Sequence, residues 1–146
     1  MNPHLQLTDL AVRYPCPEGE VCVINRLSLQ LERGEIGCLL GASGCGKTTI
    51  LRAIAGFEPL HSGQIQLDGR LLSTPQQSVA PEKRSVGMMF QDYALFPHLS
   101  VAGNVAFGLK ALGRQARQQR VLEMLELVGL ADLAKRYPHE LSGGQQ

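Results

Sequence analysis

The chain has 146 residues with 14 Lys and Arg against 13 Asp and Glu, which gives a formal net charge of +1. Hydrophobic residues make up 44% and charged residues 18%, a composition that argues against disorder, and the balanced charge argues against an electrostatically driven nucleic-acid binder. The sequence predicts no membrane-spanning helix, which needs about 20 predominantly apolar residues, and no signal peptide.

Two strands are predicted at the start of the chain. Apolar residues alternate imperfectly with polar ones from Leu5 to Tyr14, and alternate again from Val21 to Leu31. Pro15, Pro17 and Gly19 indicate a turn between them. We therefore expect an N-terminal antiparallel β portion.

A buried strand followed by a helix is predicted next. Ile36 to Leu40 is a short continuous apolar run, which is typical of a strand covered on both faces. A glycine-rich loop follows, and after it apolar residues recur at helical spacing until Gly56, a plausible helix stop. This order predicts an α/β core.

The remaining elements include a second buried strand and two helices. Residues 63–69 predict a strand that runs into an Asp-Gly turn, residues 74–84 a polar loop, and residues 86–90 a second buried strand. Helical patterns follow at 101–112 and 115–128, the latter with Val121, Leu122, Leu125 and Val128 on one face. Lys110, Arg114, Arg117 and Arg120 would share a side of a helix. A solvated face is the default interpretation, and an anion or partner site is the alternative.

The four cysteines show no metal-site or redox-motif spacing. None forms a CxxC pair, and none has a His at ligand spacing; they are Cys16, Cys22, Cys38 and Cys45. We expect packed or free thiols, and a reducing, cytoplasmic setting.

One motif carries the chemistry. Residues 41–48 read GASGCGKT and fit the phosphate-binding pattern G-x-x-x-x-G-K-[ST] without a mismatch. The motif lies between a predicted strand and a predicted helix, so its glycines can turn backbone N–H groups toward an anion at the helix N-terminus. Lys47 would reach the β- and γ-phosphates and Thr48 would coordinate Mg²⁺. The residues predicted to bind the nucleotide here are Gly41, Ala42, Ser43, Gly44, Cys45, Gly46, Lys47, Thr48 and Thr49. A glycine-rich turn with an incidental Lys is the alternative.

Three further segments make the chain resemble the ATP-binding-cassette (ABC) ATPases. Residues 141–145 (LSGGQ) resemble the signature motif, so Ser142, Gly143, Gly144 and Gln145 would contact the nucleotide held by a second subunit. Gln91, after VGMMF, is similar to the glutamine of the family's glutamine loop and would join the Mg²⁺ shell. Asp92 as a Walker B aspartate is the rival interpretation. Tyr14 stands where the family places an aromatic residue that stacks on adenine, although a Tyr that packs at a strand end stays open.

The resemblance implies a fold and a function. The fold is α/β, an ABC-type P-loop NTPase core with an N-terminal antiparallel β portion and a helical subdomain. Residues 1–92 would hold the β portion and core, and residues 93–146 the glutamine loop, helical subdomain and signature. The segments GASGCGKTTILRAIAGFEPLHSGQI and FQDYALFPHLSVAGNVAFGL are similar to the ferric-iron, polyamine, sulfate and sugar importer branches, with a leaning toward ferric iron.

That function requires partners and ATP with Mg²⁺. The resemblance implies a homodimer that holds two nucleotides, membrane permease subunits, indirectly a periplasmic binding protein, no nucleic acid, and a peripheral location at the cytoplasmic face of the cell membrane. A non-transport ABC protein of DNA repair or translation is the alternative.

The sequence also departs from the family by omission. No apolar strand ending in Asp-Glu and no switch histidine follow the signature. We expect the C-terminal part of the domain to be missing, no catalytic residue within these 146 residues, and no hydrolysis by this chain alone, so that it would act as a nucleotide-binding fragment.

Overall fold

The computed structural model describes residues 3–146. The chain divides into two compact units, Met1–Met88 and Met89–Gln146. Each unit has its own apolar core, and each is described by itself.

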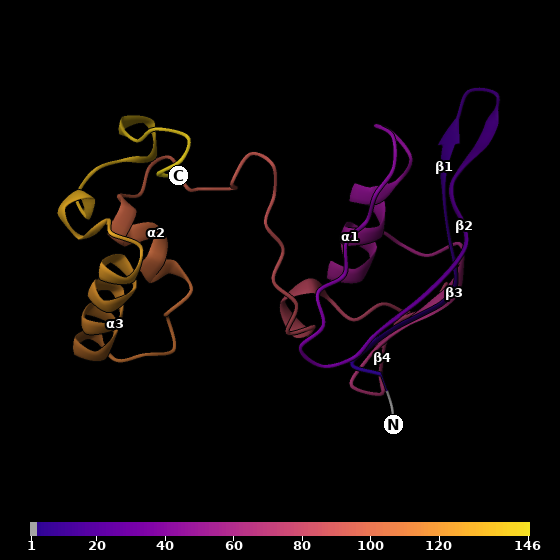
Figure 1. The fold of residues 1–146 in the computed structure, drawn as a ribbon, viewed down its shortest axis with the longest axis horizontal. Coiled ribbons are helices and arrows are strands. Elements are labelled where there is room, and N and C mark those ends of the chain that lie inside the picture. Colours follow the sequence, from indigo (N-terminus) through magenta and orange to yellow (C-terminus); the bar gives the residue numbers. More distant parts are fainter. Residues whose placement is uncertain (1–2) are drawn as a thin grey trace. The chain divides into compact units, whose positions relative to one another are not determined.

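The first unit contains one four-stranded sheet. Its strands, labelled in Figure 1, are β1 (Leu5–Cys16), β2 (Gly19–Leu31), β3 (Ser62–Leu67) and β4 (Arg70–Ser73). Hydrogen bonding gives them the order β2-β1-β3-β4. All three pairings are antiparallel. Both predicted turns are confirmed, because β1 and β2 are joined at Pro17-Glu18 and β3 ends at the Asp68-Gly69 turn. Strand β4, which completes the second hairpin, was not predicted.

An irregularity in β1 explains its imperfect alternation. The register of β1 shifts between Leu7 and Leu10 against β2, and between Thr8 and Ala11 against β3. Asp9, inside the shift, has a positive φ of 47°. Leu7 and Leu10 are therefore both buried although they are three residues apart, whereas an uninterrupted strand would direct them to opposite faces.

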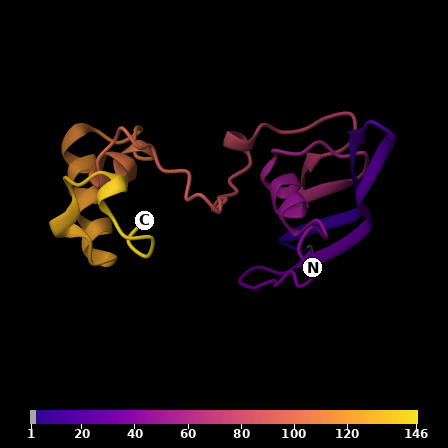
Figure 2. The same ribbon diagram turned by 90° about the horizontal axis from the view of Figure 1, so that it is seen from above.

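Helix α1 (Lys47–Ala55) covers one side of this sheet (Figure 2). Ile50 and Ala53 of α1 are buried in a core shared with all four strands. The buried members of this core are Leu7, Leu10, Val12, Ile24, Ile50, Ala53, Leu60, Ile65 and Leu72. The helix ends as predicted at Gly56, whose φ of 95° is left-handed and whose N–H donates to the carbonyl oxygens of Arg52 and Ala53.

Two predicted buried strands are wrong. Residues 36–40 and 86–90 form no strand, and Ile36 and Leu40 are 97% and 88% exposed. An apolar run becomes a strand only where neighbouring strands take up its backbone hydrogen bonds. Neither segment pairs with the other or with β1–β4, so the apolar pattern alone was not sufficient.

The second unit is helical. Helix α2 (Val101–Phe107) packs against α3 (Arg114–Leu127), and short 3₁₀ turns follow at η2 (Ala131–Leu133) and η3 (Pro138–Glu140) (Figure 1). A similar turn in the first unit is η1 (Pro81–Lys83). The second core is built on Val101, Val121 and Leu125.

The helical predictions are confirmed in type but not in every detail. Helix α2 ends at Phe107 and not at Leu112, since Gly108 follows as its C-cap. Leu122 and Val128 were predicted on the buried face of α3 but are more than half exposed. Lys110 lies outside both helices, and its Nζ is 3.8 Å from the centre of the Phe107 ring.

Arg114 and Arg120 are exposed, as the solvated interpretation predicts, and Arg120 forms an ion pair with Glu123 at 3.0 Å. Arg117 is partly buried. Within residues 3–146, no helix combines the length and apolar character needed to cross a lipid bilayer. All four cysteines are free thiols.

Candidate functional site

The loop of residues 41–46 precedes α1 and has the backbone of an anion cradle. Gly41, Gly44 and Gly46 have φ angles of 156°, 82° and 93°. The latter two are left-handed, a region in which L-residues with a Cβ are strained. The loop therefore needs glycine at these positions to arrive at the N-terminus of α1, where backbone N–H groups are free to bind an anion.

Lys47 turns back over this loop. Its Nζ donates to the carbonyl oxygens of Gly41 and Ala42, each at 2.7 Å, and lies 3.5 Å from the Cys45 Sγ. The ammonium group is therefore held against the loop by two carbonyl oxygens and the Cys45 sulfur. An anion that enters the loop would gain a charged donor already in position.

Close contacts fix the two ends of the loop. A Cβ at Gly46 would lie 3.0 Å from the carbonyl oxygen of Val23 in β2, and a Cβ at Gly41 would lie 2.6 Å from the Cys45 Sγ. The loop thus packs against β2 at one end and against itself at the other. A Cβ at Gly41 would have to displace the Cys45 side chain, and a Cβ at Gly46 would press on the backbone of β2.

Thr48 and Thr49 stand in the first turn of α1, where Thr48 is exposed. A hydroxyl oxygen is a ligand that suits Mg²⁺, which prefers hard oxygen donors. The residues present therefore fit a magnesium-bound phosphate chain: backbone amides and Lys47 for the phosphate oxygens, and the Thr48 hydroxyl for the cation.

Tyr14 lies near the end of β1, paired with Val21 of β2. It is half-buried and packs against the core of the first unit. This contact gives Tyr14 a packing role, which was the alternative to adenine stacking. The two roles are compatible because Tyr14 is only partly buried.

Gln91 belongs to the second unit and is exposed. Gln91 was predicted to follow directly after a buried strand, but residues 86–90 are irregular and form no strand. Tyr93 and Ala94, just beyond it, have positive φ values of 55° and 51°. Two consecutive residues with a Cβ in this region indicate a strained turn in the predicted glutamine loop.

The predicted signature segment also belongs to the second unit. Leu141 packs against its core, and the following residues form a turn in which the Gln145 N–H donates to the Ser142 carbonyl at 2.9 Å. The Gln145 side chain accepts from the Ser142 N–H at 3.1 Å. Gly143 and Gly144 are exposed with open space around them, so their backbone can be approached closely.

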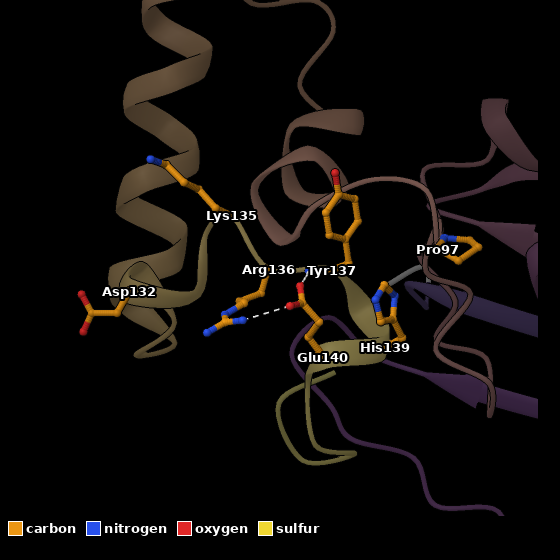
Figure 3. Close-up of a pocket in the computed structure, with 7 residues that line it drawn as sticks. All are labelled: Pro97, Asp132, Lys135, Arg136, Tyr137, His139 and Glu140. Atoms are coloured by element: carbon orange, nitrogen blue, oxygen red, sulfur yellow. Dashed lines mark hydrogen bonds and ion pairs between the residues drawn. The ribbon is translucent and has the colours of Figure 1, made fainter.

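A surface pocket of about 670 Å³ lies at the entry to this segment (Figure 3). It is lined by Pro97, Asp132, Lys135, Arg136, Tyr137, His139 and Glu140. Glu140 accepts from the Tyr137 N–H at 2.7 Å and from the Arg136 guanidinium at 2.9 Å. These donors, the Tyr137 N–H first, lower the pKa of Glu140. The pocket contains none of the predicted nucleotide-binding residues, and both carboxylate oxygens of Glu140 accept hydrogen bonds at the start of η3.

Two structural residues were missed by the sequence analysis. Arg84 is buried at 1% exposure and contacts the C-terminal end of α1. Asn104 of α2 binds the backbone of Phe96 through both its amide nitrogen and its amide oxygen. Neither residue belongs to a recognisable motif, and only the fold shows which backbone groups it meets.

Comparison with known proteins decides the family. The sequence profile of the family described as "ABC transporter" matches residues 24–146. The chain belongs to the ABC transporter family. This match confirms the family to which the phosphate loop and signature pointed.

Curated members of the ABC family with similar sequences are import ATP-binding proteins. The chain is 50% identical to the spermidine/putrescine import ATP-binding protein PotA of Acidothermus cellulolyticus, over 99% of this chain and 37% of that protein. It is 49% identical to the putrescine transport ATP-binding protein PotG of Escherichia coli, over 100% of this chain and 37% of that protein. It is 48% identical to the trehalose/maltose import ATP-binding protein MalK of Thermococcus litoralis, over 88% of this chain and 36% of that protein. The chain therefore spans little more than a third of these relatives' length.

A solved ABC structure confirms the fold. A dimeric, post-hydrolysis ATP-binding cassette bound to ADP and phosphate matches with a TM-score of 0.83 at 26% identity, over 97% of this chain and 64% of that one. The ABC ATPase fold, an antiparallel sheet with helices, is thus the fold of this chain.

Proposed function

We propose that this chain is the nucleotide-binding part of an ABC ATPase subunit that powers solute import. The observation that carries the proposal is the loop of residues 41–46, which holds the Lys47 ammonium against its own carbonyl oxygens at the N-terminus of α1. A positive side chain, free backbone amides and a helix N-terminus then face the same anion.

Mg-ATP is the ligand that fits this arrangement. Residues 41–49 would hold the phosphates, and Thr48 and Gln91 would supply oxygen ligands to Mg²⁺. Tyr14, which is only partly buried, would stack on the adenine. Ser142, Gly143, Gly144 and Gln145 would contact the nucleotide bound to a second subunit, which requires a dimer of the kind solved for the similar cassette.

The proposed partners follow from the relatives. PotA, PotG and MalK are import or transport ATP-binding proteins, and this likeness supports membrane permease subunits as partners, with a periplasmic binding protein acting through them. The protein would lie at the cytoplasmic face of the membrane.

The cargo is proposed only as a small solute. The curated relatives named above import polyamines or trehalose and maltose, so they give no support to the ferric-iron leaning of the sequence. Ferric iron stays a hypothesis drawn from residues 41–49 and 55–58.

The experiment is ATP hydrolysis by the full-length protein, alone and with its membrane partners reconstituted. We expect Lys47-dependent hydrolysis, and we expect deletion of the gene to abolish uptake of one solute. Hydrolysis together with unchanged uptake of all tested solutes and a DNA-repair or translation defect would instead support a non-transport ABC protein. Hydrolysis that survives Lys47→Ala would contradict the proposed site.

A further inference from the structure

Arg84 follows η1 and is a buried cation without a carboxylate partner among its contacts. Its guanidinium donates to six oxygen acceptors, all of them neutral. They are the carbonyl oxygens of Ala53, Ile54, Leu72 and Val79 and the hydroxyl oxygens of Ser73 and Ser78. Burial lowers the pKa of Arg84, but an arginine stays charged in proteins.

Two of these acceptors belong to the last turn of α1. Nη1 donates to the Ala53 carbonyl at 3.0 Å and to the Ile54 carbonyl at 2.9 Å. The final carbonyl groups of a helix lack partners within the helix and carry its negative dipole end. The Arg84 cation therefore caps the helix at the end opposite the phosphate loop.

The other side of the guanidinium binds the sheet. Nη2 donates to the hydroxyl oxygens of Ser73, the last residue of β4, and Ser78, each at 2.6 Å. Ser73 and Ser78 also form a backbone bridge with each other. One rigid planar group thus joins the end of α1 to the end of β4.

Gly56 leaves room for this junction. A Cβ at Gly56 would overlap the Arg84 Nε, and Gly56 has a left-handed φ of 95°. The helix stop at Gly56, predicted from the sequence, is therefore also the opening through which Arg84 reaches the carbonyl groups of α1.

We propose that Arg84 is a positioning residue for nucleotide binding, because it fixes the C-terminal end of α1 and with it the loop at the N-terminal end. The inference rests on the proposed function. Helix α1 has only nine residues, so it spans about 14 Å and a displacement of one end is carried to the other. Lys47 and Thr48 stand in the first turn, so they move with the helix. A hydrophobic residue would fill the same space but could not hydrogen-bond to α1, to β4 and to residues 78–79 at once.

The experiment measures the Kd of Mg-ATP and of Mg-ADP for the full-length protein and three variants. Arg84→Met removes the charge and all six hydrogen bonds, and Arg84→Lys keeps the charge but loses the planar fork. Leu72→Ala is the control, because it cuts a buried side chain of the same core and leaves the Leu72 carbonyl in place. All measurements are made below the Tm of each variant.

We expect Arg84→Met to raise both Kd values about tenfold and Arg84→Lys about threefold, while Leu72→Ala lowers the Tm and leaves Kd within about twofold of wild type. An unchanged Kd in Arg84→Met overturns the proposal and would mean that Arg84 contributes only to the stability of the fold. If Arg84→Met does not fold, Arg84→Lys decides in the same way. Failure of the wild type to bind Mg-ATP would contradict the proposed function itself, which separates the two results.

Discussion

The Nζ of Lys47 lies 2.7 Å from the carbonyl oxygen of Gly41, six residues before it in the chain. The bond closes the phosphate loop on itself and holds the ammonium group where an anion would sit against it. A ligand phosphate therefore has to replace uncharged carbonyl acceptors, and its negative charge adds a Coulomb attraction to the ammonium group that those acceptors lack.

Gly46→Ala and Gly44→Ala form a matched pair of loop variants. Both place a Cβ at a left-handed φ, at a cost of about 1–2 kcal/mol. Only at Gly46 would the new Cβ also lie 3.0 Å from the Val23 carbonyl oxygen, since nothing lies within 4 Å at Gly44. We expect Gly46→Ala to lose more free energy of unfolding, as measured by denaturant titration. Equal losses would mean that the contact with β2 does not hold the loop.

Tyr14 variants separate stacking from packing. Tyr14→Ala should weaken ATP and ADP binding equally, because the base is common to both, and stacking is worth about 1–3 kcal/mol per base in nucleic-acid systems. Tyr14→Phe and Tyr14→Trp should keep the affinity. The measurement is calorimetric titration of each nucleotide. Unchanged affinity in Tyr14→Ala, together with a lower Tm, would leave Tyr14 as a core residue alone.

Asn104→Ala should loosen the segment that leads from Gln91 to α2. The Asn104 amide accepts from the Phe96 N–H at 2.8 Å and donates at 3.1 Å to the carbonyl oxygens of Phe96, Leu99 and Ser100. At roughly 1 kcal/mol for each net hydrogen bond, we expect a loss of about 2–3 kcal/mol in unfolding free energy.

The rate of hydrogen exchange at the Phe96 amide directly measures the protection that the Asn104 side chain gives this N–H. We expect faster exchange in Asn104→Ala than in Asn104→Asp, because the aspartate keeps an acceptor for that N–H. Equal exchange rates in the two variants would exclude Asn104 as the anchor of the segment.

The sequence predicts correctly those elements that depend on neighbouring residues, and it fails for those that depend on contacts between distant parts of the chain. The turn at Asp68-Gly69 and the helix from Lys47 to Gly56 are set by neighbouring residues, and the sequence predicted them correctly. The segments 36–40 and 86–90 were mistaken for strands, because a strand depends on partners elsewhere in the chain. Arg84 was missed because its six acceptors come from residues 53–79, which only the fold brings together.

Asp68 should make stability depend on acid pH. Its carboxylate accepts from His4 Nδ1 at 2.7 Å and from Arg33 at 2.9 Å, and these partners, His4 first, lower the pKa of Asp68 below its ordinary 3.8. A group whose folded pKa is depressed stabilises the fold above its unfolded pKa, and this contribution disappears as the pH falls through the folded pKa.

We therefore expect wild type to exceed Asp68→Asn in unfolding free energy at pH 5, and the difference to shrink as the pH falls below about 4. The control is Glu18→Gln, at an exposed carboxylate in the β1–β2 turn. A difference that grows on acidification would have the wrong sign for this cluster.

The most direct test of the account is Mg-ATP binding by the full-length protein and its Lys47→Ala variant, measured as thermal stabilisation. At a ligand concentration of 100 times Kd, wild type should gain about 2.7 kcal/mol. Lys47→Ala should lose most of this gain, and Lys110→Ala, which removes an exposed lysine of the second unit, should keep it. Equal stabilisation of wild type and Lys47→Ala would show that the loop of residues 41–46 does not bind the nucleotide phosphates.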